Sequence, residues 1–160
     1  MKQKTLAILL MVVIIGVAVC AAIVYAYIVP HFGLELATSG KGVISPKYLP
    51  WLVFTSLTAI PVAIVLIMSF IISVNISRNR SFCMENARLL AIISILAAAG
   101  TFYFFAGNVV FVILKMHNGG FFVLNMLVCF AGFAMSVAAA ALSHYARKAA
   151  ALKEQADLTI

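Results

Sequence analysis

Residues 89–114 read LLAIISILAAAGTFYFFAGNVVFVIL, a stretch with no charged residue, no histidine and no proline. A helix needs roughly 20 consecutive apolar residues to cross the hydrocarbon core of a bilayer, and this stretch is longer. Residues 6–29, 51–74 and 121–142 likewise lack charged residues and histidine. Backbone hydrogen bonds cannot stay open in lipid, and the stretches lack the alternation of barrel strands. The sequence therefore predicts an all-α polytopic membrane protein, a four transmembrane helix bundle that forms one membrane domain over residues 1–160.

The composition excludes other classes of protein. Hydrophobic residues make up 66% of the chain and charged residues 9%, whereas a soluble domain has roughly 45–50% and about 25%. Disorder requires the opposite balance, low hydrophobicity with high charge. The first stretch is longer than the roughly 7–15 apolar residues of a signal peptide, so we expect it to remain uncleaved as the first span.

The distribution of basic residues predicts the topology. Most of the 11 lysine and arginine residues precede the first stretch, lie between the second and third, or follow residue 142. Cytoplasmic loops carry such an excess, which places both termini and the residue 143–160 tail in the cytoplasm. The net charge of +7 suits anionic lipid. No clustered basic face with aromatic residues is visible, so we expect no direct contact with nucleic acid.

Candidate chemical groups are few. The four stretches hold no ionisable group of the kind that marks pumps and voltage sensors, and the chain shows no paired carboxylates and no Ser/His/Asp or Cys/His arrangement. We therefore expect no enzyme, no catalytic residue and no cofactor. His31, Glu35 and His117 on the outer side could form a metal site of the His₂Glu kind. The alternative is a solvated interface, which the intervening Gly33 and the flexible loops favour, so no metal is predicted.

Mild polar and small residues within the stretches predict helix packing. Asn108 and Asn125 lie near the outer ends of the third and fourth stretches and should meet across the hairpin between them. Gly132, Ser136 and Ala140 recur at four-residue spacing, which permits close approach of a neighbouring helix. Pro61 predicts a kink in the second span.

Two features on the cytoplasmic side stand out. The third helix should begin at Ser81, a good N-cap residue, with Glu85 in its first turn. The fourth helix should continue from Phe121 to Lys153, roughly 50 Å against about 30 Å of hydrocarbon, and so project into the cytoplasm.

The projecting part carries an apolar stripe with heptad-like spacing. It is formed by Leu142, Tyr145, Ala149, Leu152 and Ala156. The stripe could receive a partner helix. It could equally pack on the chain's own segment at residues 82–84, or lie on lipid headgroups, and two heptads do not decide between these.

Two short motifs resemble a known family. They are Ser81-Phe82 followed by Asn86-Ala87-Arg88-Leu89-Leu90 and Ile93, and the close ALKEQADLTI at residues 151–160. These resemble the YoaS-like proteins, a bacterial family of four-helix membrane proteins built on a domain of unknown function, with motifs sF-x-x-x-N and L-K-E-E-x-D-L-T-I. Gln155 replaces the second acid of the latter. The resemblance covers nearly the whole chain.

The resemblance implies no chemical activity, because the family has none assigned to it. Members are often encoded beside a very small helix-turn-helix regulator, similar to pairs in which a membrane protein restrains its transcription factor. The hypothesis is therefore a regulatory protein of the bacterial inner membrane that captures such a regulator through its cytoplasmic loop and tail. The residues expected to bind the partner are Phe82, Asn86, Arg88, Leu152, Glu154, Asp157, Leu158 and Ile160.

Two alternatives remain open. One is a small transporter or channel-like protein, working as a homo-oligomer, in which the Asn108/Asn125 pair and the small-residue stripe line an interface or pore. The other is a structural subunit of a larger membrane complex.

Overall fold

The computed structural model describes residues 3–38, 48–81, 83–114 and 119–157, and every regular element within them is helical. The elements are α1 (Gln3–Ile23), the π-helix η1 (Val24–Ile28), α2 (Val29–Thr38), α3 (Tyr48–Leu57), α4 (Ala59–Ser77), α5 (Met84–Ile113) and α6 (Gly119–Asp157). Four helical segments are long and apolar enough to cross a membrane: Lys4–His31, Tyr48–Ser77, Met84–Ile113 and Phe122–Ala156. The predicted all-α membrane fold with four spans is confirmed.

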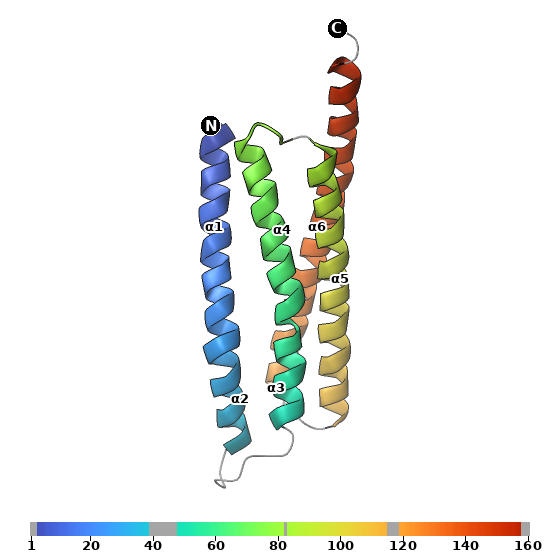
Figure 1. The fold of residues 1–160 in the computed structure, drawn as a ribbon. Coiled ribbons are helices and arrows are strands. Elements are labelled where there is room, and N and C mark those ends of the chain that lie inside the picture. Colours follow the sequence, from blue (N-terminus) through green and yellow to red (C-terminus); the bar gives the residue numbers. More distant parts are fainter. Residues whose placement is uncertain (1–2, 39–47, 82, 115–118, 158–160) are drawn as a thin grey trace.

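The spans run alternately up and down (Figure 1). The N-terminus, the α4–α5 connection and the C-terminal turns of α6 lie at one end, and the α2–α3 and α5–α6 connections lie at the other. α1 packs on α4, α4 packs on α5, and the most extensive contact joins α5 to α6. Ile72 of α4, Ile93 of α5 and Ala139 of α6 form the buried apolar cluster where these three helices meet. Many other large apolar side chains are exposed on the helices, where they face the lipid of the bilayer.

The first two spans are irregular at neighbouring points. A proline lacks the N–H group of a regular helix, and its ring clashes with the carbonyl four residues earlier. Pro30 follows the π-helix of the first span, and Pro61 follows the break at Thr58 that separates α3 from α4. The disturbance predicted at Pro61 appears as an interruption of the helix at Thr58, one turn earlier. The Thr58 hydroxyl donates to the Thr55 carbonyl at 2.6 Å and lies 2.8 Å from the Tyr25 hydroxyl, which therefore donates to Thr58.

The stretch between the first two spans contains more helix than expected. Residues 30–50 read as a connection, yet α2 extends the first span through Thr38 and α3 begins at Tyr48. A Cβ atom at Gly33 would overlap the rings of Tyr48 and Trp51, and the Tyr48 hydroxyl donates to the Pro30 carbonyl at 3.2 Å. These aromatic side chains hold α2 against α3.

The third helix begins two residues later than predicted. Its first helical residue is Met84, and the N-cap residue is Cys83, which makes no side-chain capping bond. The assignment of the N-cap to Ser81 was wrong, whereas Glu85 does lie in the first turn.

The reason for the later start lies in how α4 ends. Asn79 is left-handed at φ 61°, its N–H bonds the Ile76 carbonyl at 3.1 Å, and the Arg80 N–H bonds the Asn75 carbonyl at 3.0 Å. This is a Schellman ending, and it uses residues 79 and 80 to reverse the chain before α5 can begin.

The predicted extension of the fourth helix is confirmed. α6 has 39 residues and continues without a break to Asp157. At 1.5 Å per residue it is roughly 58 Å long, about twice the hydrocarbon thickness of a bilayer. Figure 1 shows its last turns standing beyond the N-terminus and the α4–α5 connection.

Candidate functional site

A buried amide closes the α4–α5 connection from the inside. The Asn86 side chain on α5 is only 2% exposed. Its Oδ1 accepts a bond of 2.8 Å from Nδ2 of Asn75 on α4, and its own Nδ2 donates to the carbonyls of Arg80 at 3.1 Å and Ser81 at 3.2 Å. Buried polar groups are costly unless paired, so these bonds hold Arg80 and Ser81 against the start of α5.

The adjacent residue of α5 joins the same turn to α6. The Ser143 hydroxyl donates to the Ala87 carbonyl at 2.7 Å, and both residues are buried. A single turn of α5 therefore holds the α4–α5 connection on one side and the start of the projecting part of α6 on the other. A displacement of α6 at Ser143 would act directly on this turn.

The contact between α5 and α6 is a seam of small and polar residues. On α5 the residues recur every seven positions, at Ala87, Ser94, Thr101 and Asn108. Opposite them on the antiparallel α6 lie Ser143, Ser136, Gly132 and Asn125. The Ser136 hydroxyl donates to the Ser94 carbonyl at 3.0 Å, and Asn125 Nδ2 donates to Asn108 Oδ1 at 2.5 Å. The predicted meeting of the two asparagines is confirmed.

The predicted stripe of small residues was correct in part. Gly132 and Ser136 face α5, but Ala140 is exposed, and Ala139 at 8% exposure takes its place. The seam follows the 3.5-residue repeat of two supercoiled helices, and a strict four-residue spacing drifts off it.

We expect the asparagine pair to contribute modestly to stability. A double-mutant cycle with Asn108→Ala and Asn125→Ala should give a coupling energy of about 0.6 kcal/mol and no more than about 1.7 kcal/mol. The Asn108 amide also donates to the Phe104 carbonyl at 2.7 Å, so Asn108→Ala should cost more than Asn125→Ala. Unfolding in mixed detergent micelles measures all four proteins. Zero coupling would show that the bond contributes nothing in the membrane.

The apolar stripe predicted on the projecting part of α6 is open. Leu142, Tyr145 and Leu152 are 58%, 68% and 66% exposed. The α6 residues at this level that turn inward are Ser143 and Ala150. These three side chains are therefore not buried against the described residues of the chain, and packing of the stripe on Phe82, which lies outside them, stays a prediction.

Five of the eight predicted partner-binding residues lie on two elements that the structure describes, α5 and α6. Arg88, Leu152 and Glu154 are exposed, the first on α5 and the others on the projecting turns of α6. Asn86 is buried and bonded within the chain, so it shapes the connection without presenting its side chain. Asp157 is the last residue of α6, and Phe82, Leu158 and Ile160 lie outside the described residues. Asn75 and Ser143, which complete the cluster, were not predicted.

Positive charge is concentrated at the end of the molecule where α6 projects, here termed the basic end. Among the described residues it carries three acidic groups, Glu85, Glu154 and Asp157, and a larger set of basic groups: Lys4, Arg78, Arg80, Arg88, Arg147, Lys148 and Lys153. All seven of these basic side chains are exposed. The basic end therefore attracts anionic partners.

No trio of His, Cys, Asp or Glu that could hold a metal comes together among the described residues. His117 lies outside them, so the predicted choice between a metal site and a solvated interface stays a prediction.

Two comparisons with known proteins bear on this geometry. A family described as a protein of unknown function, DUF2975, matches residues 37–160, which include α3 to α6. The uncharacterized membrane protein YoaS of Bacillus subtilis (strain 168) is 26% identical over 161 residues, 99% of each chain. No solved structure matches significantly. The resemblance drawn from the two short motifs is confirmed.

Proposed function

We propose, since the chain belongs to the DUF2975 family of proteins of unknown function, that it is a regulatory membrane protein that captures a small helix-turn-helix transcription regulator. The observation that carries this proposal is the projecting part of α6, which leaves the membrane domain with its apolar stripe exposed. A helix that only packed within the bundle would need none of these turns.

The orientation follows from charge. Basic residues near the ends of spans favour the cytoplasmic side, so the basic end faces the cytoplasm of a bacterium and both termini lie inside. Capture then uses exposed residues of α5 and α6, together with neighbouring residues of the two motifs. This set comprises Arg88, Leu152, Glu154, Phe82, Asp157, Leu158 and Ile160, with Asn86 holding the connection in shape.

Release of the partner would depend on motion of the spans. Helices distort most easily where the regular hydrogen bonding is already interrupted, and η1 and the Thr58 break are two such places joined by the Tyr25–Thr58 bond. α4 runs from that break to Asn75, which bonds Asn86. A signal that moves α4 would thus reach the turn that also holds Ser143 of α6.

Truncation tests the proposal. A chain ending at Ser143 should insert normally and lose capture, because the projecting turns are gone. A chain ending at Ala151 is the matched variant, since it keeps the inward-facing Ala150 and removes only the last turns; it should insert and also lose capture. The measurement is affinity purification from crosslinked native membranes beside the full-length chain. Recovery of the same soluble partner with the chain ending at Ser143 would disprove the proposal.

The transporter alternative has less support. Asn108 and Asn125, which would line a pore, are buried and bonded to each other across the α5–α6 seam.

A further inference from the structure

We propose that the exposed stripe of α6 receives an amphipathic helix whose apolar face is flanked by carboxylates, an inference that rests on the proposed function. The stripe is Leu142, Tyr145, Ala149, Leu152 and Ala156, and its occupant is a helix of another protein.

The face of α6 opposite the stripe is held against the bundle. α6 is one continuous helix whose opposite face is held by the buried Ser143, bonded to Ala87, and by the buried Ala150. The α5–α6 register places Ala150 level with the α4–α5 connection, so Leu152 and Ala156 belong to the turns that follow this level. Figure 1 shows the last turns of α6 beyond that connection. Tyr145 and Leu152 are exposed on the outer side of α6, where a second helix can lie alongside.

The charges that border the stripe select the occupant. If Ala149 and Leu152 take heptad positions a and d, Lys148 lies at the flanking position g and Lys153 at the flanking position e. These flanking positions face each other across a helix pair and set partner choice. A second copy in the same membrane would lie parallel, and its Lys153 would oppose Lys148. Like charges disfavour that pairing, whereas glutamate or aspartate on the occupant would match both lysines.

The other basic residues at the basic end also favour an occupant that carries carboxylates. Arg147 on α6 and Arg78, Arg80 and Arg88 on the neighbouring helix ends are all exposed. This excess of positive charge draws acidic partners and raises their rate of association. The three acidic groups at this end, Glu85, Glu154 and Asp157, are outnumbered by the basic groups and do not offset it.

Binding of two designed peptides tests the inference. Each is a helix with leucine at the heptad core positions; one carries glutamate and the other lysine at the flanking positions. The full-length protein is held in nanodiscs of neutral phosphatidylcholine, and peptide binding is followed by fluorescence anisotropy. We expect the glutamate peptide to bind at least about tenfold more tightly than the lysine peptide. Lys148→Glu with Lys153→Glu should reverse this preference.

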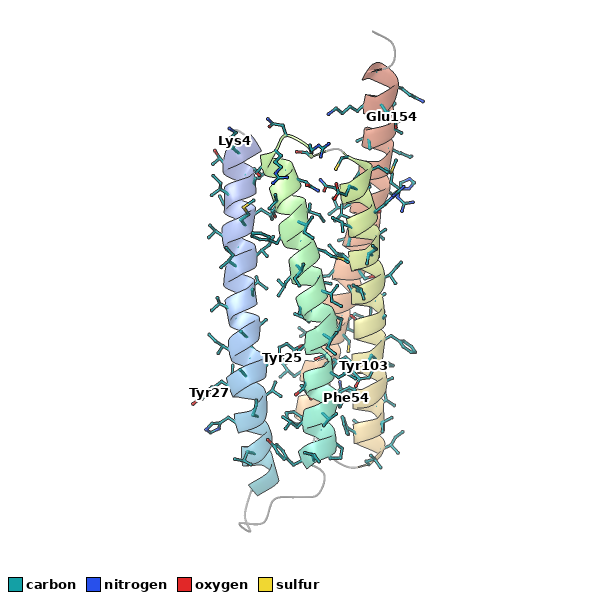
Figure 2. The ribbon with its side chains drawn as sticks, viewed as in Figure 1. Lys4, Tyr25, Tyr27, Phe54, Tyr103 and Glu154 are labelled. Atoms are coloured by element: carbon teal, nitrogen blue, oxygen red, sulfur yellow. The ribbon has the colours of Figure 1, made fainter. Side chains whose placement is uncertain are left out.

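The matched control changes charge at the same end but away from the stripe. Figure 2 shows Lys4 on α1 on the far side of the basic end from Glu154 of α6. Lys4→Glu should leave the preference for the glutamate peptide in place. Equal binding of the two peptides, or a reversal by Lys4→Glu as large as that by the lysine pair, would overturn the inference.

Two further outcomes would assign the stripe to another occupant. Disulfide formation between copies carrying Leu152→Cys would identify a second copy. Loss of peptide binding in nanodiscs that contain phosphatidylglycerol, with protection of that cysteine from labelling, would identify lipid. Either result overturns the inference without touching the truncation experiment, because tail-dependent capture of a regulator is measured separately in native membranes.

Discussion

Replacing Gly132 with leucine should separate α5 from α6 and destabilise the protein by about 1–3 kcal/mol, the usual cost of overpacking. A Cβ atom at this position would already overlap the Thr101 side chain. The close approach at Gly132 also aligns the Ser136–Ser94 and Ser143–Ala87 bonds further along the same seam. Unfolding of the purified protein by SDS in mixed micelles measures the loss.

Gly16 provides the matched control, because it is a membrane glycine with nothing within 4 Å of a Cβ atom built on it. Gly16→Leu should change stability by no more than about 0.5 kcal/mol, as expected of an exposed site. Thr101→Ala should recover part of the loss in Gly132→Ala, since it removes the atoms in the way. Equal effects of leucine at Gly16 and Gly132 would refute the importance of close packing between α5 and α6.

The spans could be predicted because their evidence is compositional, but their packing faces could not. In a soluble helix the apolar residues mark the buried face. Here nearly every residue of a span is apolar, so that periodicity carries no information. The informative residues are the small and polar ones, such as Ser94 and Thr101 on α5, whose seven-residue spacing identifies the seam. Reading the fourth span at strict four-residue spacing located Gly132 but missed Ala139.

The cluster around Asn86 shows a second limit of prediction from the sequence. The motif around Asn86 was identified, but a polar residue in a motif can bind a partner or hold its own chain, and spacing alone does not distinguish these roles. Here the left-handed Asn79 reverses the chain so that Asn75 and Asn86 meet. That meeting depends on a turn conformation that asparagine adopts only sometimes. The exposed stripe on α6, by contrast, was predictable because charged residues return from Arg147 onward, so that the spacing of apolar residues again marks one face of the helix.

Replacing Asn86 with leucine should unfold the α4–α5 connection and cost about 1–3 kcal/mol for each buried group left without a partner. Leucine has a similar size, so the loss comes from hydrogen bonding and not from a cavity. The Asn75 amide is buried and would lose its acceptor, and the carbonyls of Arg80 and Ser81 would lose a donor. Hydrogen exchange of the residues around the connection, together with SDS unfolding, measures both effects.

Two variants separate the buried bond from the turn around it. Asn79→Gly keeps the left-handed conformation and should change stability little, because glycine adopts positive φ without strain. Asn75→Leu combined with Asn86→Leu should recover part of the loss of Asn86→Leu, since no unpaired amide remains between the helices. If the double variant is as unstable as the sum of the single ones, the amide pair is not the source of the stability. If Asn86→Leu is as stable as Asn79→Gly, the connection does not depend on Asn86, and a direct role of its side chain in partner binding becomes the better explanation of the motif.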